Sequence, residues 1–218
     1  MIDCQMPMDS KIKKTYLWWI AYLLIEILLI YILKYKVSKK ICWLGLAGLL
    51  YIYVNVLFRE YKREQLFVNG IVSYVSVVLT GLLLGNLLSP TIILILGMVA
   101  SVTDILSFTK YGQNTANAKA MAEPKYLYRL MVYGKGKGEE LYPTCGIGDY
   151  LYFAMWIGGL CENIKMLWLL GMGVLIGNMM NMFFAHILRT KSGYKGIPAV
   201  PLPFICVMVL YCASKVWG

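Results

Sequence analysis

Seven apolar runs, most of them close to the length of a membrane helix, alternate with short polar connections along this chain. A helix that crosses the hydrocarbon core needs roughly 20 apolar residues, and only helices and closed barrels satisfy their backbone there. The sequence therefore predicts an all-α, polytopic membrane helix bundle of about seven transmembrane helices. The predicted helices cover residues 16–33, 41–58, 66–88, 91–108, 148–161, 166–188 and 197–217.

The composition agrees with a membrane location. Of the 218 residues, 60% are hydrophobic and only 15% are charged, whereas soluble domains carry about 25% charged residues. The first apolar run is too long for the apolar core of a signal peptide, and no small-residue cleavage pattern follows it. We therefore expect it to be retained as a helix.

Lysine and arginine collect on one side of the predicted helices. The N-terminus and the second, fourth and sixth loops hold 15 of the 21 basic residues. Because cytoplasmic loops are enriched in Lys and Arg, we expect a cytoplasmic N-terminus and an external C-terminus. An anionic lipid leaflet accounts for the net charge of +10 without a nucleic-acid partner.

The six cysteines predict neither a metal site nor a cofactor. They form no CxxC pair and no Cys/His metal-ligand spacing. Four of them lie within or at the ends of apolar runs, where a free cysteine behaves as a small hydrophobe.

Two acids are placed to meet near the cytoplasmic surface. Asp104 lies about four to six residues, or roughly 6–9 Å, from the cytoplasmic end of its predicted helix. Asp149 opens the next helix from the same side. Ionisable residues inside membrane segments are costly and usually functional. A cap for the helix N-terminus would explain Asp149 alone, but not Asp104, which lies where the helix dipole disfavours negative charge.

A carboxylate pair at this depth suits peptide hydrolysis. One ionised carboxylate takes a proton from water while a protonated partner supports the scissile carbonyl. Two like charges about 4 Å apart repel by roughly 4 kcal/mol at an effective dielectric constant near 20. The pair therefore retains one proton at neutral pH.

The segments around Asp149 suggest how a substrate is held. Gly146 and Gly148 can adopt positive φ or admit a neighbouring backbone. Residues 126–133, which include Leu130 and Val132, have the β-prone composition of a strand that a substrate strand could join; an interfacial aromatic segment is the alternative. Three prolines between residues 198 and 203 predict a distorted start to the last helix.

Three motifs follow one another in the second part of the chain: Asp104, Gly146-Ile147-Gly148-Asp149 and Pro198-Ala199-Val200-Pro201. Their order and approximate spacing resemble the presenilin and signal peptide peptidase family of GxGD intramembrane aspartyl proteases. The residues after Asp149 look closest to the presenilin-like microbial homologues. Thr103 stands where the family usually has Tyr, Val200 where it usually has Leu, and seven helices are expected where the family usually has nine.

This resemblance implies the roles of the residues. Asp104 and Asp149 would be the catalytic pair, acting without a metal on transmembrane protein or peptide substrates. The glycine motif, including Ile147, the segment that contains Leu130 and Val132, and the segment 198–201 would bind substrate. The resemblance covers a catalytic four-helix portion, residues 90–218; residues 1–89, with three helices, carry no recognised motif. Accessory subunits and self-association stay open.

Two alternative functions fit parts of the pattern. A prepilin or preflagellin peptidase also uses a GxGD acid, but usually has an Ile-Pro-Asn-like segment after the first acid, where this chain has Ile-Leu-Ser-Phe. A proton- or cation-coupled transporter or channel also uses membrane carboxylates. Glu26, in the first helix, is expected to pair with Asn55 or Asn69. Residues 135–140 are expected to form a solvated loop, or alternatively a segment cut during maturation.

Overall fold

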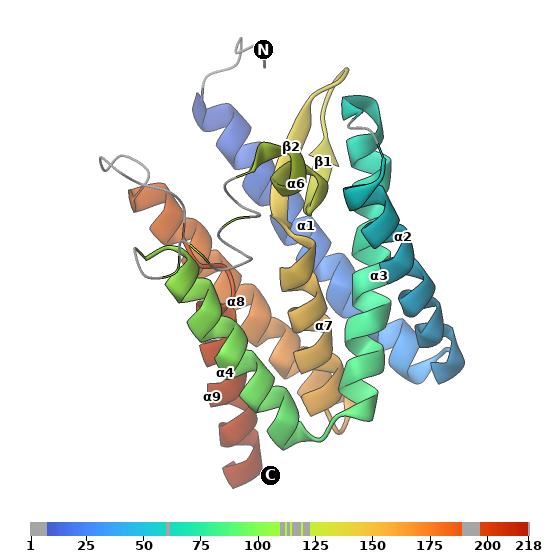
Figure 1. Cartoon of the computed structure of the whole chain (residues 1–218). Helices are drawn as coiled ribbons and strands as arrows, with labels where there is room; N and C mark the ends of the chain where they lie inside the picture. Colours follow the sequence, from blue (N-terminus) through green and yellow to red (C-terminus); the bar gives the residue numbers. More distant parts are fainter. Residues whose placement is uncertain are drawn as a thin grey trace.

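The computed structural model describes residues 8–59, 62–109, 112, 114, 119, 123–188 and 197–217. This part of the chain is mostly helical, and its long helices run alongside one another as an elongated bundle (Figure 1). A two-stranded sheet lies at the end of the bundle that carries the N-terminus. The long helices are α1 (Met8–Tyr35), α2 (Leu44–Leu57), α3 (Leu66–Leu87), α4 (Pro90–Ser107), α7 (Ile147–Leu160), α8 (Ile164–Leu188) and α9 (Pro201–Trp217).

Five of the described helical segments are long and apolar enough to cross a membrane. They are α1, α4, α8, α2 together with η1 (Lys39–Trp43), and α3 together with η2 (Arg63–Gln65). Large apolar side chains such as Leu28, Ile95 and Met98 are exposed on them, which suits contact with lipid. The chain is therefore a helical membrane protein. Because α9 is shorter and α7 has 14 residues, the count of seven spans stays a prediction.

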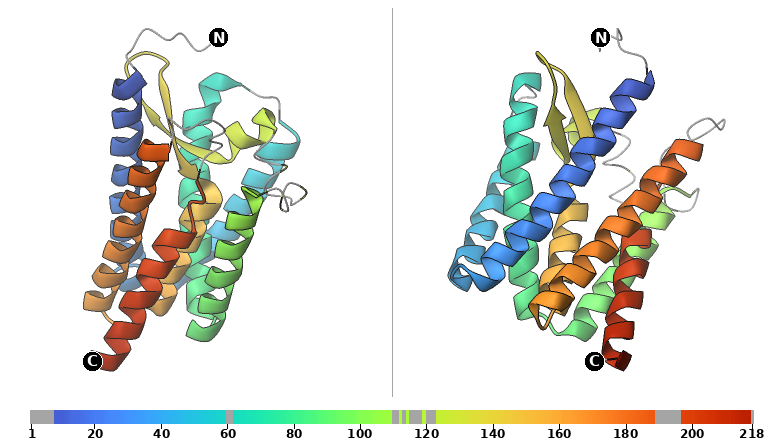
Figure 2. Two further views of the ribbon diagram at one scale, coloured as in Figure 1. Left: turned by 90° about the vertical axis from the view of Figure 1, so that its left-hand side faces the viewer. Right: turned by 180° about the vertical axis from the view of Figure 1, so that it is seen from behind.

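Helix α7 occupies the centre of the bundle. It contacts α1, α3, α4, α8 and α9, and the views in Figure 2 place it between α3 on one side and the α4, α8 and α9 group on the other. Its aromatic side chains Tyr150, Phe153 and Trp156 are fully buried. Helices α1 and α3 thus pack directly on the helix that begins within the glycine motif.

Backbone contact between α3 and α7 depends on glycine. A Cβ atom at Gly81 would lie 2.4 Å from the carbonyl oxygen of Leu151. Because lipid removes most of the hydrophobic drive for helices to associate, membrane helices depend on this kind of close packing. The small residues of α3 therefore set how near α7 can lie.

A hairpin leads directly into α7. Strand β1 (Met131–Lys135) pairs antiparallel with β2 (Leu141–Gly146), and the register joins Met131 to Gly146 and Lys135 to Leu141. Gly138, with φ of 68°, lies in the connection. The predicted loop 135–140 is therefore the end of β1 and a compact turn, in which the Gly136 N–H donates to the Glu140 carbonyl over 2.9 Å.

The strand predicted over residues 126–133 is only partly correct. Its first half belongs to the short helix α6 (Pro124–Arg129), and the strand begins at Met131. The buried Arg129 guanidinium donates to the carbonyl oxygens of Asn55 (3.2 Å) and Val56 (2.7 Å) at the end of α2. This distant contact overrides the local β propensity.

The distorted start of the last helix is confirmed. Residues 197–200 are not helical, and α9 begins at Pro201, a position where the missing N–H of proline costs nothing. Several basic residues that entered the predicted orientation, in the loop between the two acids and in residues 189–196, lie outside the described residues. Cys4 also lies outside them.

Candidate functional site

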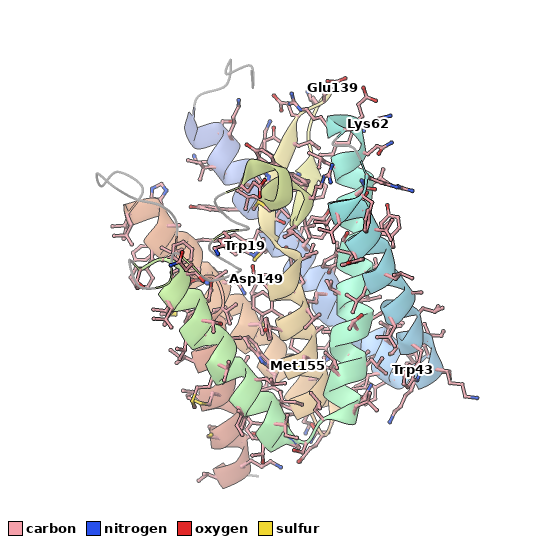
Figure 3. All side chains as sticks on the ribbon, viewed as in Figure 1. Trp19, Trp43, Lys62, Glu139, Asp149 and Met155 are labelled. Atoms are coloured by element: carbon pink, nitrogen blue, oxygen red, sulfur yellow. The ribbon has the colours of Figure 1, made fainter. Side chains whose placement is uncertain are left out.

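Asp149 lies in the first turn of α7 and folds back toward β2. One oxygen, Oδ2, accepts hydrogen bonds from the Gly146 N–H (3.1 Å) and the Cys145 thiol (2.9 Å). Burial raises the pKa of the Cys145 thiol, so the thiol remains a donor rather than a second anion. Figure 3 shows Asp149 inside the bundle, between the level of Met155 and the end that carries Lys62 and Glu139.

Asp104 lies in the last turn of α4 and is half-buried. Its Oδ2 atom accepts the Val200 N–H over 3.0 Å, and the Ala199 N–H also faces this carboxyl group. These donors compensate for a negative charge at a helix C-terminus, where the helix dipole opposes it. The proline segment thus contacts one of the two predicted catalytic acids.

The structure places the two acids on helices that pack against each other, within electrostatic reach of one another. The Asp104 charge acts on Asp149, and the Tyr152 hydroxyl lies within electrostatic reach of both carboxyl groups. Both acids lie in the half of the bundle that carries the hairpin, since α4 ends there and α7 begins there (Figure 1). The two acids therefore lie at a similar level along the bundle, and their depth in a membrane stays a prediction.

The two glycines of the motif matter for the room that their missing side chains leave, and neither has positive φ. Gly138 is the one described glycine with positive φ. A Cβ atom at Gly146 would lie 3.1 Å from Asp149 Oδ2, whereas nothing lies within 4 Å of a Cβ atom at Gly148. Gly146 does not use the positive φ that glycine allows, because it ends β2 in an extended conformation with φ of −65° and ψ of 146°. Gly148 is exposed and faces open space.

The residues of the predicted substrate strand make bonds within the hairpin. The Leu130 carbonyl accepts the buried Ile147 N–H over 2.8 Å, and the Val132 carbonyl accepts the Thr144 hydroxyl over 2.9 Å. Contact of Leu130 and Val132 with substrate stays a prediction. The partner strand β2 was missed because it contains Pro143, which is a poor strand signal.

The segment 198–201 is held between helices. Val200 and Pro201 are buried, and Pro198 and Ala199 are half-buried. The Asn181 amide of α8 donates to the Ala199 carbonyl over 2.8 Å. This bond joins α8 to the non-helical segment that precedes α9.

Glu26 does not pair with the asparagines expected for it. The Asn69 amide donates to Asn55 Oδ1 over 3.5 Å and accepts the Tyr51 hydroxyl over 2.6 Å. Glu26 is fully buried, and its carboxyl oxygens have no hydrogen-bond partner among the described residues. It lies instead within electrostatic reach of Asp149. A third carboxyl group therefore lies near the pair.

Three tyrosines pack together where α1, α3 and α7 meet, and one of them, Tyr150, follows Asp149 in sequence. The Tyr22 and Tyr150 rings pack edge-on against Tyr74, with centroids 5.1 and 5.0 Å away. The Tyr22 hydroxyl donates to the Tyr133 carbonyl over 2.8 Å, which ties the hairpin to α1. Aromatic content alone did not reveal this cluster, since its members lie far apart in sequence.

Within the described part of the chain, no three His, Cys, Asp or Glu side chains come together in a way that could hold a metal ion. No protein-family model and no curated protein matches this chain.

Proposed function

We propose that this chain is an intramembrane aspartyl protease that hydrolyses peptide bonds of transmembrane helices. The observation that carries the proposal is that Asp104 and Asp149 come from two packed helices and lie within electrostatic reach of each other, with Asp104 bonded to the proline segment. Buried carboxyl groups are costly, and two that share a site suit acid–base work on one water molecule.

The pair would act on a water molecule between the two carboxyl groups. The ionised aspartate takes a proton from the water as its oxygen attacks the scissile carbonyl carbon, and the protonated aspartate gives its proton to the carbonyl oxygen. Collapse of the tetrahedral intermediate breaks the carbon–nitrogen bond: one hydroxyl group of the intermediate returns its proton to the ionised aspartate, and the amine leaves with the proton held by the other aspartate. Each turnover returns the pair to one shared proton.

The proposal also covers how a substrate reaches the two acids and how the chain is oriented in the membrane. Gly148, open on the side where a Cβ atom would stand, would admit the substrate backbone, and the hairpin would hold it as a strand. The N-terminus and the loop between the acids would lie in the cytoplasm and the C-terminus outside. Partners would be transmembrane substrates and the lipid bilayer.

Binding of a transition-state analogue tests the proposal. An aspartyl protease inhibitor with a hydroxyl group in place of the scissile carbonyl should bind the purified chain, because it satisfies both carboxyl groups at once. Asp104→Ala should abolish the binding. Retained affinity in this variant would contradict a site built from both acids.

One observation favours a second candidate, a proton-coupled transporter. Glu26 adds a third buried acid near Asp149, and chains of carboxyl groups carry protons through membranes. Proton flux into liposomes that contain this chain, lost in Glu26→Gln and unaccompanied by proteolysis, would favour this candidate over the protease.

A further inference from the structure

Asn181 connects a helix that makes no direct hydrogen bond to either predicted catalytic acid with the segment that does. We propose that Asn181 is a positioning residue for Asp104, acting through the backbone of residues 199 and 200. The inference rests on the proposed function, since it gives α8 a part in aligning the acid pair.

The chain of contacts has two links. The Asn181 amide Nδ2 donates to the Ala199 carbonyl over 2.8 Å, and the next peptide N–H, that of Val200, donates to Asp104 Oδ2 over 3.0 Å. The Ala199 carbonyl and the Val200 N–H belong to one planar peptide unit. Fixing the carbonyl of this unit therefore fixes the direction of its N–H.

Close packing on both sides holds the first turn of α9, which follows this peptide. On α8, a Cβ atom at Gly177 would lie 2.4 Å from Pro203 Cα. On α4, a Cβ atom at Gly97 would lie 2.2 Å from the Phe204 ring. The start of α9 is thus held between the helix that carries Asn181 and the helix that carries Asp104. Asn181 is the residue that sets the rotation of the peptide within this space.

Asn178 provides a matched control on the same helix. It is as deeply buried as Asn181, but its amide donates to the Val174 carbonyl of its own helix over 2.9 Å. Replacing either asparagine by leucine removes a buried amide of similar size. Only the Asn181 change removes a bond to the proline segment.

Two readouts separate positioning from simple stability. In Asn181→Leu the peptide can rotate, so the Val200 amide should exchange with solvent roughly five- to tenfold faster than in the wild-type chain, as expected for the loss of one hydrogen bond. The Asp104 carboxylate then loses donors that stabilise its charge. The acid limb of the pH–rate profile for cleavage should therefore move to higher pH.

The experiment compares wild-type chain with Asn181→Leu, Asn178→Leu and Asn181→Gln in the same detergent. The inference expects faster exchange and a moved acid limb in Asn181→Leu, neither in Asn178→Leu, and partial recovery in Asn181→Gln, which restores an amide donor. Equal exchange in the two leucine variants, or faster exchange with an unmoved acid limb, overturns it. If the wild-type chain cleaves nothing, the proposed function fails, and the exchange rates alone decide whether Asn181 orients this peptide.

Discussion

At the scale of single residues, the environment of Asp149 is set by atoms next to it in sequence. Its carboxylate folds back onto the Gly146 N–H and the Cys145 thiol, which stabilise it near the N-terminus of α7. A Cβ atom at residue 146 would lie 3.1 Å from Asp149 Oδ2, so a side chain there would crowd this conformation. Gly146 therefore leaves room for this conformation of Asp149, and Gly148 leaves open space beside the acid.

The first prediction compares the two glycines. Gly146→Ala should lower kcat about tenfold, because its Cβ atom crowds Asp149 Oδ2 at 3.1 Å and one charge-assisted hydrogen bond is worth roughly 1.5 kcal/mol. Gly148→Ala meets no atom within 4 Å, so any effect should appear in KM for a reporter substrate. Unchanged kcat in Gly146→Ala would show that the observed Asp149 conformation is not the one that acts.

The second prediction concerns stability. Glu26 is fully buried without a hydrogen-bond partner among the described residues, and such a group costs about 1–3 kcal/mol. Glu26→Leu should therefore raise the midpoint of thermal unfolding in detergent. Asn55→Leu, which breaks the contact with Asn69, should lower it. A lower midpoint in Glu26→Leu would reveal a stabilising interaction that the structure does not show.

At the scale of elements, a buried arginine connects α6, which leads into the hairpin, to the end of α2. Arg129 reaches the carbonyl groups at the end of α2, which have no partner further along their own helix. Because β2 runs directly into α7, this contact also limits the movement of Asp149. The connection between Asp104 and Asp149 is thus anchored to the bundle shortly before α7 begins.

The third prediction tests this anchor. Arg129→Met removes hydrogen bonds from a charged group, each worth roughly 1.5–3 kcal/mol, and should expose the hairpin to proteolysis. Trypsin should cut after Lys135 or Lys137 at least about tenfold faster than in the wild-type chain. Arg63→Met, at an exposed position, serves as the control, and equal cutting rates in both variants would contradict the anchoring role.

The fourth prediction concerns the contact of α3 with α7. Gly81→Ala should destabilise the chain by roughly 1–3 kcal/mol, because its Cβ atom would lie 2.4 Å from the Leu151 carbonyl. Gly70→Ala, on the same helix, meets its nearest atoms at 3.5 Å and should be neutral or slightly stabilising. Denaturation in detergent measures both. Similar losses in the two variants would show that helix spacing is not limited at Gly81.

At the scale of the whole molecule, the long apolar runs of the sequence predicted more of the structure than the strand or helix propensity of short segments did. The apolar runs located the long helices to within a few residues at most ends, because a bilayer requires long uninterrupted helices. The first helix is the exception, since it begins at Met8 rather than at residue 16. The common depth of Asp104 and Asp149 could also be predicted, because adjacent antiparallel spans return to the same surface.

The parts that could not be predicted depend on contacts between distant segments. Helix α6 forms where a strand was expected, because Arg129 finds carbonyl groups more than 70 residues earlier in the chain. Glu26 faces Asp149 rather than Asn55 because α1 packs against α7. Local patterns carry no information on which faces of seven similar apolar helices meet. Glu26 and the cluster of Tyr22, Tyr74 and Tyr150 near the acids could therefore be identified only from the fold.

Cleavage of a membrane-spanning reporter tests the account most directly. The purified chain, reconstituted in liposomes with a single-helix reporter, should release two products whose new ends, identified by mass spectrometry, lie within the transmembrane segment. Asp104→Asn and Asp149→Asn should each lower the rate of cleavage by about a hundredfold or more. The reaction needs one ionised and one protonated carboxyl group, and each variant leaves only one carboxyl group. Cleavage at the wild-type rate in either variant would contradict the claim that these two carboxyl groups form one catalytic site.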